Sequence, residues 1–188
     1  MRKFLFITIS AVLISCTNEV KEELNAVNNE ATFQQNVENF MEFTKRFGNE
    51  DIEGVMDMFA DSALWSPPEF NSYEWMPKDS LMGAMSNYMN SFDELTFTPG
   101  INLPEGNVVD GFWGGSRYRS DGAENTSSLS SASPNNIRVY GTWSSVHSET
   151  GKQTYSKWYA IINFNERGKI IRFNDWFNVD GLEVQINQ

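Results

Sequence analysis

The sequence predicts one α+β domain, in which a cone-shaped, curved antiparallel sheet is covered by three N-terminal helices. Apolar residues recur with helical spacing as far as Phe92, and from Leu95 onward they alternate with polar residues, which is typical of strands. Helices followed by a run of strands are the order of α+β domains, where the helices cover one face of the sheet. With 188 residues, the chain is long enough for one such domain with a buried core.

Three amphipathic helices are predicted in order. The first begins at Phe33 and carries its apolar stripe to Phe47, with Gly48 as a left-handed C-terminal cap. Asn49 is then the expected N-cap of a second helix, whose apolar face is formed within residues 52–59. Pro77 favours the start of the third helix, because its missing N–H is not needed in the first turn. The apolar stripe of that helix is predicted to extend to Phe92.

The strands come next. A short strand is predicted at residues 63–66 and another at 95–98, followed by three long strands at 137–147, 155–164 and 169–178. Gly151 and Gly168 supply the positive φ that tight hairpin turns require between the three long strands. Consecutive hairpins predict an antiparallel meander, and a strongly curved sheet closed by helices leaves an open cone in which apolar pockets form.

The N-terminal segment has the features of an export signal. Arg2 and Lys3 precede a short apolar run that is too short to span a bilayer comfortably. The run ends at Leu13-Ile14-Ser15-Cys16, which resembles the lipobox of bacterial lipoproteins, where the chain is cut before the Cys and that Cys is acylated. An ordinary signal peptide with an incidental Cys16 is the alternative. The resemblance implies an exported protein that is lipid-anchored to a bacterial cell-envelope membrane.

The predicted organisation of the chain follows from these patterns. Residues 1–15 are a lipoprotein signal peptide, 16–31 a polar tether rich in Asn and Glu, and 32–184 the folded domain. Within the domain, residues 112–136 form a flexible insertion that ends in a Ser/Asn-rich stretch, and 185–188 are a C-terminal tail. The lipid anchor is the only membrane contact expected, because an acidic body is repelled by anionic headgroups.

Composition excludes several classes of function. The formal net charge of −11 disfavours nucleic-acid binding, which needs basic surface to displace counterions from phosphates. The single Cys excludes an internal disulfide, and one Cys with one His provides too few ligands for a structural zinc site. We therefore expect no metal, no cofactor and no nucleic-acid partner.

The order of elements and three segments resemble the nuclear transport factor 2-like superfamily, and within it the SnoaL-like, or polyketide cyclase-like, group. Residues 51–61 resemble the helix that leads into the first strand, 140–143 a middle strand and 168–177 the closing strand. The resemblance covers about residues 33–182, with the insertion as the main departure. The superfamily includes isomerases, cyclases, dehydratases, epoxide hydrolases and members without catalysis, so the resemblance implies a fold rather than a reaction.

Asp175 is the main catalytic candidate. By the period of two in a strand, it shares one face of the closing strand with Phe173 and Phe177. A carboxylate among apolar side chains is costly unless it is bonded, paired or protonated, and burial raises its pKa toward the range useful for proton transfer. SnoaL-like enzymes similarly use an acidic residue on the pocket side of the sheet. The alternative is a structural Asp bonded to backbone or paired with Arg138.

His147 and a set of aromatic residues complete the candidate site. His147 ends the first long strand, where it either shuttles protons at the pocket rim or faces solvent beside the following turn. Five rings are predicted to line the cavity around a flat apolar ligand, and the alternative is that they fill the core. These ligand-binding candidates are Trp65, Tyr88, Trp143, Trp158 and Phe173.

Three functions compatible with these features remain open. The first is a membrane-tethered domain that binds a small apolar molecule in its cone, which we favour. The second is a cofactor-independent acid/base enzyme of isomerase, cyclase or lyase type that uses Asp175. The isomerase version is disfavoured, because the ketosteroid-isomerase branch has a Tyr on its first helix where this chain offers only Phe and Met. The third is a non-catalytic interaction module, with homodimer formation through the exposed sheet face.

Overall fold

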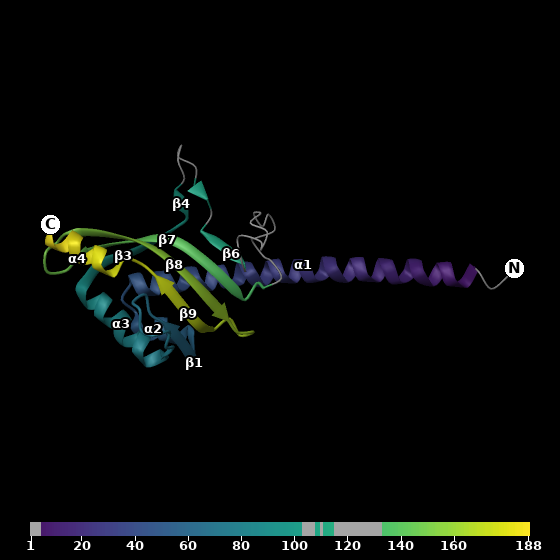
Figure 1. Cartoon of the computed structure of the whole chain (residues 1–188), viewed down its shortest axis with the longest axis horizontal. Coiled ribbons are helices and arrows are strands. Elements are labelled where there is room, and N and C mark those ends of the chain that lie inside the picture. The colour runs from purple at the N-terminus through teal and green to yellow at the C-terminus, as the bar shows by residue number, and fades with distance from the viewer. Residues whose placement is uncertain (1–4, 103–107, 110, 115–132) are drawn as a thin grey trace.

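The computed structural model describes residues 5–102, 108–109, 111–114 and 133–188, and it describes side chains within 27–100, 111–114 and 133–188. One strongly curved sheet holds helices in its concave side, and Figure 1 shows strands β7 to β9 arching over helix α1. The predicted α+β class, with helices packed on a curved and mostly antiparallel sheet, is confirmed.

Four helices are present in the described part of the chain. They are α1 (Leu5–Gly48), α2 (Ile52–Asp57), α3 (Lys78–Ser91) and α4 (Val179–Asn187). The three predicted helices correspond to α1, α2 and α3, whereas α4 was not predicted. It spans the predicted boundary between the domain and the tail at residue 184, and its N-cap Asn178 accepts a hydrogen bond from the Gly181 N–H at 3.0 Å.

The main sheet has the strand order β2-β1-β9-β8-β7-β3, with β6 also paired to β7. Strand β1 runs parallel to β9, and all other pairs are antiparallel. Strands β4 and β5 form a separate pair. The strands are β1 (Phe59–Ser66), β2 (Met76–Pro77), β3 (Phe92–Pro99), β4 (Ile101–Asn102), β5 (Val108–Val109), β6 (Phe112–Gly114), β7 (Asn136–His147), β8 (Gln153–Phe164) and β9 (Ile170–Trp176).

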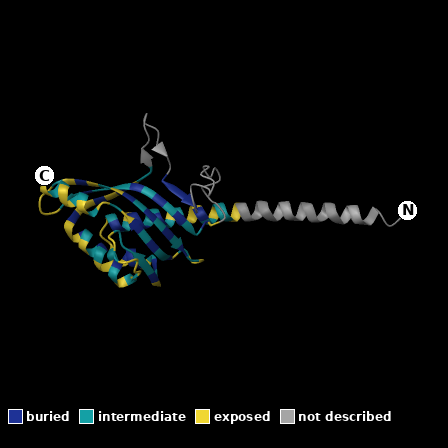
Figure 2. Ribbon diagram, viewed as in Figure 1, coloured by how far each residue is buried: buried dark blue, intermediate teal, exposed yellow. Residues whose placement is uncertain are grey.

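The predicted meander of β7, β8 and β9 is present, and its two turns contain Gly151 and Gly168 with φ of 68° and 71°. Burial alternates along the strands, so that in β8 every second residue from Trp158 to Phe164 is buried, as Figure 2 shows for the sheet as a whole. This alternation is what the period of two predicted.

Three local predictions were wrong. Gly48 does not take the left-handed conformation; Glu50 does, with φ of 59°, and Gly48 is needed because a Cβ there would lie 2.5 Å from the Leu95 carbonyl oxygen. The N-cap of α2 is Asp51 rather than Asn49, since its side chain accepts a hydrogen bond from the Gly54 N–H. The second and third helices were also predicted too long, by two residues and one residue, because α2 ends at Asp57 and α3 at Ser91, and Phe59 and Phe92 each begin a strand.

The N-terminal predictions are largely outside what the structure describes. The backbone of α1 includes residues 16–31, predicted as a tether, but the side chain of Cys16 is not among those described. Within the described residues, no helix has the length and apolar character needed to cross a membrane. Of the predicted insertion at 112–136, residues 115–132 lie outside the described part.

The core lies between α1 and the concave side of the sheet. Phe40 of α1 is fully buried, and its ring contacts the rings of Phe43, Phe97, Phe112 and Trp158 at centroid distances of 5.5 to 5.9 Å. Such offset and edge-to-face contacts add to the free energy that burial alone contributes. This aromatic cluster fixes the sheet on α1 at the place where the cavity described below begins.

Substituting Gly141, in the middle of β7, is expected to destabilise the protein. A Cβ there would lie 2.3 Å from Phe97 Cζ and 2.7 Å from the Thr98 backbone oxygen, and the backbone cannot move away easily. Gly141→Ala should therefore lower the free energy of unfolding by about 1–3 kcal/mol, measured by urea titration. The matched control is Gly83→Ala on the exposed side of α3, where nothing lies within 4 Å. That substitution should leave stability unchanged or raise it slightly.

Candidate functional site

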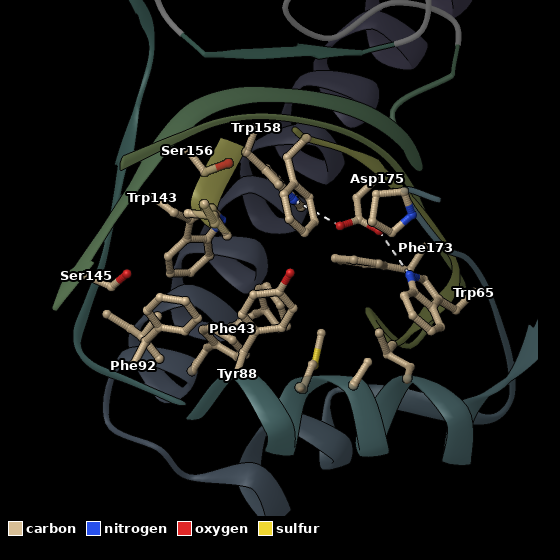
Figure 3. A pocket seen from close by; sticks show the side chains of 18 of the residues that line it. Phe43, Trp65, Tyr88, Phe92, Trp143, Ser145, Ser156, Trp158, Phe173 and Asp175 are labelled. Carbon is tan, nitrogen blue, oxygen red and sulfur yellow. Dashed lines mark hydrogen bonds between the residues drawn. The ribbon is translucent and has the colours of Figure 1, made fainter. Parts of the chain in front are cut away.

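A cavity of about 140 Å³ lies between the concave side of the sheet and helices α1 and α3. Nine of the nineteen residues that line it are aromatic, and Figure 3 shows the rings of Trp65, Trp143 and Tyr88 around the open space. The lining residues are Phe43, Phe47, Trp65, Pro68, Glu69, Leu81, Ala84, Met85, Tyr88, Phe92, Leu95, Trp143, Ser145, Ser156, Trp158, Phe173, Asp175, Phe177 and Leu182.

Strand register places the central side chains of this cavity. On β9, Asp175 faces inward, and its partner on β8 is Ala160. Trp65 on β1 pairs with Phe173, and Trp158 on β8 pairs with Gly141 on β7. Large indoles therefore approach Asp175 from the strands on both sides of β9.

Both carboxylate oxygens of Asp175 accept hydrogen bonds from indoles. Trp65 Nε1 donates to Oδ1 at 2.9 Å, and Trp158 Nε1 donates to Oδ2 at 3.0 Å, as the dashed lines in Figure 3 show. The side chain is only 7% exposed. The backbone of Asp175 also forms a hydrogen bond with this carboxylate. Since a carboxylate has about four lone-pair sites, one remains for a group in the cavity.

The pKa of Asp175 is raised from 3.8 to about 6, and the largest cause is burial of the carboxyl group. The two indole hydrogen bonds lower this pKa, and the nearby charge of Glu69 raises it by a smaller amount. Burial also raises the pKa of Tyr88, with Glu69 and Asp175 adding to the effect, so its hydroxyl stays protonated. Near neutral pH the cavity therefore holds an ionised carboxylate with a pKa close to 6, beside a neutral phenol.

The structure brings six of the predicted site residues together. Asp175 and all five aromatic candidates line the same cavity. His147 does not line it: the residue is half-buried, its ring centroid lies 5.4 Å from that of Phe92, and its Nδ1 lies 3.0 Å from Thr150 Oγ1 in the turn after β7. The alternative partner of Asp175 is also not observed, because Arg138 Nη1 donates to Tyr159 Oη at 2.8 Å.

Several lining residues were missed by sequence reasoning. Phe43 and Phe47 were recognisable as helix residues, but helical spacing alone does not say which of them borders a cavity. Leu182 was missed with helix α4. Glu69 follows Pro67-Pro68 in a segment without periodicity, so no pattern placed it at the cavity mouth. Ser156 was identifiable from its place on the inward face of β8, two residues before Trp158.

Polar atoms without partners also lie at this cavity. Ser156 Oγ is buried and has no hydrogen-bond partner among the described residues. The Tyr88 hydroxyl points from α3 toward the middle of the cavity in Figure 3. No group of three His, Cys, Asp or Glu side chains suited to a metal ion occurs in the part of the chain that the structure describes. The polar groups available to a ligand are thus hydroxyls and carboxylates.

Removing the charge of Glu69 is expected to lower the pKa of Asp175. The Glu69 charge disfavours ionisation of Asp175, so Glu69→Gln should bring the pKa down from about 6 toward its ordinary value. The carboxyl carbon of Asp175, followed by carbon-13 NMR during a pH titration, measures this directly. Glu166→Gln, in the exposed turn between β8 and β9, is the control and should leave the titration unchanged.

Comparison with known proteins identifies the fold. No protein-family model and no curated protein sequence matches the chain. Among solved structures, a Bacillus subtilis protein provisionally named an isomerase superposes with a TM-score of 0.56 at 14% identity, covering 83% of this chain and 95% of that one. A Xanthomonas campestris protein provisionally named a polyketide cyclase superposes with a TM-score of 0.55 at 10% identity, covering 82% of this chain and 98% of that one.

A third structure, an LEH-like epoxide hydrolase of M. tuberculosis, superposes with a TM-score of 0.51 at 9% identity, covering 82% of this chain and 90% of that one. At such low identity the likeness concerns the fold alone. The chain therefore has the nuclear transport factor 2-like fold that its sequence resembles.

Proposed function

We propose that the domain binds a small, largely apolar molecule in this cavity. The observation that carries the proposal is an accessible space of about 140 Å³ lined largely by aromatic and aliphatic side chains, with an ionisable carboxylate on its wall. An engineered cavity of about 150 Å³ with apolar walls binds benzene, so this space suits a ligand near the size of one ring. The similar structures named as isomerases, cyclases and hydrolases also support a small-molecule site in this fold.

Orientation within the cavity would come from its polar atoms. A hydrogen-bond donor of the ligand can donate to the free lone pair of Asp175, and an acceptor of the ligand can accept a hydrogen bond from the hydroxyl of Tyr88 or Ser156. Satisfying the unpartnered Ser156 oxygen would also remove the cost of leaving a buried hydroxyl without a bond.

Tryptophan fluorescence with a panel of single-ring and branched-chain molecules tests the proposal, because three Trp residues line the cavity. We expect a shift or quenching that saturates, together with a raised Tm. Ala84→Phe should abolish both effects by filling the space, whereas Met82→Phe on the exposed side of α3 should not. Binding that survives Ala84→Phe, or no binding by any molecule in the panel, would contradict the proposal.

Acid/base catalysis by Asp175 is the second candidate function. A specific observation favours it: burial places the pKa of this carboxyl at about 6, close to neutral, where a general base works best. Asp175 would accept a proton from a bound substrate and return it to another atom of that molecule. If a reaction is found, its rate should rise with pH through about 6 and be lost in Asp175→Asn. A variant that kept the full rate would exclude this role.

Export and lipid anchoring through Cys16 are also part of the proposal, supported by the lipobox-like sequence Leu13-Ile14-Ser15-Cys16. Expression of the full chain in bacteria with a labelled fatty acid tests it. Label should enter the membrane-bound protein and be absent from Cys16→Ser. Equal labelling of that variant would contradict anchoring at this residue.

The sheet face opposite the cavity is the proposed site of homodimer formation. Its support is a row of aromatic rings across β7, β8 and β9. The ring centroid of Tyr159 lies 4.5 Å from that of Tyr140 and 5.0 Å from that of the exposed Trp176. Sedimentation of the full chain should show a dimer that Trp176→Glu weakens. A strict monomer at high concentration would contradict it.

A further inference from the structure

The charged groups at the cavity are all negative. Among the described residues that line it, Asp175 and Glu69 carry charge, and none is Lys, Arg or His. An anionic ligand would be repelled by both carboxylates and would find no counter-charge. The formal net charge of −11 on the whole chain acts in the same direction, because it raises the local concentration of cations.

Asp175 is a buried carboxylate whose hydrogen-bond donors are neutral. Its two oxygens are bound by the indoles of Trp65 and Trp158, which carry no positive charge. The ion pairs found in the described part of the chain join Lys or Arg to other acids, Glu42, Asp51 and Asp61. A buried ionised group without an opposite charge is costly, and a cation beside it removes much of that cost.

The remaining walls suit a cation as well as an apolar group. Trp65 from β1, Trp143 from β7 and Tyr88 from α3 surround the space, as Figure 3 shows. Aromatic rings attract cations within about 6 Å of their centres, most strongly when water is excluded. In a cavity of about 140 Å³, an occupant cannot lie far from these rings. The combination of rings and a carboxylate is the arrangement that holds alkylated ammonium groups.

We propose that the ligand of this cavity is a small organic cation, an amine or quaternary ammonium group with apolar substituents and no anionic group. This inference rests on the proposed function, since it names the class of molecule that the same cavity takes. Asp175 supplies the counter-charge, the rings bind the alkylated face of the cation, and the Tyr88 and Ser156 hydroxyls bind a polar substituent.

Choline and its neutral carbon isostere, 3,3-dimethylbutan-1-ol, separate charge from shape. Both are titrated into the full chain at pH 8, with Trp fluorescence and calorimetry as readouts. We expect choline to bind at least about tenfold more tightly, because only choline neutralises Asp175. If the alcohol binds as tightly as choline, the proposed function survives and the cationic class is wrong. If neither binds, the cationic class is wrong, and the panel of single-ring and branched-chain molecules decides the proposed function.

The pH dependence gives a second readout on the unaltered protein. The other titratable groups on the cavity wall are Glu69, at the mouth, and Tyr88 on α3; the neighbouring strands and helices present Trp65, Trp158, Phe43 and Leu182. With a pKa of about 6 for Asp175, about a tenth of the protein is ionised there at pH 5, so choline affinity should fall about tenfold from pH 8 to pH 5. The alcohol should show no such fall. A choline affinity independent of pH would overturn the proposal.

Asp175→Asn should reduce choline affinity about tenfold or more and the affinity for the alcohol by much less, while circular dichroism shows whether the variant is folded. Glu166→Gln, which removes an acid of the same charge from the exposed β8–β9 turn, should leave both affinities unchanged. Unchanged choline binding by Asp175→Asn would overturn the role of Asp175. If that variant does not fold, the pH dependence of the unaltered protein decides.

Discussion

Ionisation of the buried Asp175 is expected to lower the free energy of unfolding of the unaltered protein by about 3 kcal/mol as the pH rises, and Asp175→Asn should abolish this pH-dependent decrease. Burial raises the pKa of Asp175 from 3.8 in the unfolded chain to about 6 in the fold, and that difference corresponds to about 3 kcal/mol. Below pH 3.8 the group is protonated in both states and costs nothing. As pH rises through 3.8 toward 6, the unfolded chain loses its proton first, so the folded state becomes relatively less stable.

Urea titrations at pH 4 and pH 7 measure this effect. The stability of the unaltered protein, relative to Asp175→Asn, should fall by about 2 kcal/mol between these values, because part of the loss has already occurred at pH 4, and it should stay nearly constant above pH 7. Asn also places an amide beside two indole donors, but that cost does not change with pH and cancels in the comparison. Asp93→Asn, at an exposed position on β3, should show no such change. If the free energy of unfolding depends on pH in the same way for Asp175→Asn and for the unaltered protein, the pKa of Asp175 is not raised by burial.

Phe40→Ala is expected to destabilise the fold more than any exposed substitution. Phe40 is 0% exposed, and its ring stacks on Trp158 at 5.8 Å with an interplanar angle of 18°. Removing it leaves a cavity at the centre of the core, at a cost of about 3–5 kcal/mol. For a chain of this length, Tm should fall by roughly 10 °C, measured by calorimetry or circular dichroism.

Phe70→Ala is the matched control for this prediction. Phe70 is the same residue type at 77% exposure, and its loss should change the free energy of unfolding by less than about 0.5 kcal/mol. Because Trp158 also donates to Asp175, Phe40→Ala should weaken ligand binding even at temperatures where the variant stays folded. Equal stabilities of the two variants would show that Phe40 is not at the centre of the core.

The sheet and the position of Asp175 were predictable because alternate residues of a strand point to opposite faces, so the sequence alone shows which side chains share a face. A period of two assigns Phe173 and Asp175 to one face of β9 and Trp176 to the other, and no knowledge of neighbours is needed. Trp143 and Trp158 were predicted to line the cavity, but alternation alone left open which face of each strand is the inward one. That each then meets the same cavity follows from the antiparallel register of β7 and β8.

Other features depend on long-range contacts that no local pattern reveals. The indole of Trp65 reaches Asp175 only because β1 pairs with β9 in parallel, across more than a hundred residues of sequence. Gly48 was read as a C-cap, yet its lack of a side chain is required by the Leu95 carbonyl of β3. Helix α4 was missed because it has only nine residues, carries Gly181 near its start, and has no fully buried residue.

Carbon-13 NMR titration of the Asp175 carboxyl group tests most directly the claim that an ionisable acid lies on the wall of a hollow, aromatic interior. The signal is identified by its absence from the Asp175→Asn spectrum. We predict a pKa of about 6, raised because the walls of the cavity exclude water from the carboxylate. A pKa near the ordinary value of 3.8 would mean that Asp175 meets bulk solvent, and it would contradict both the site and the functions proposed for it.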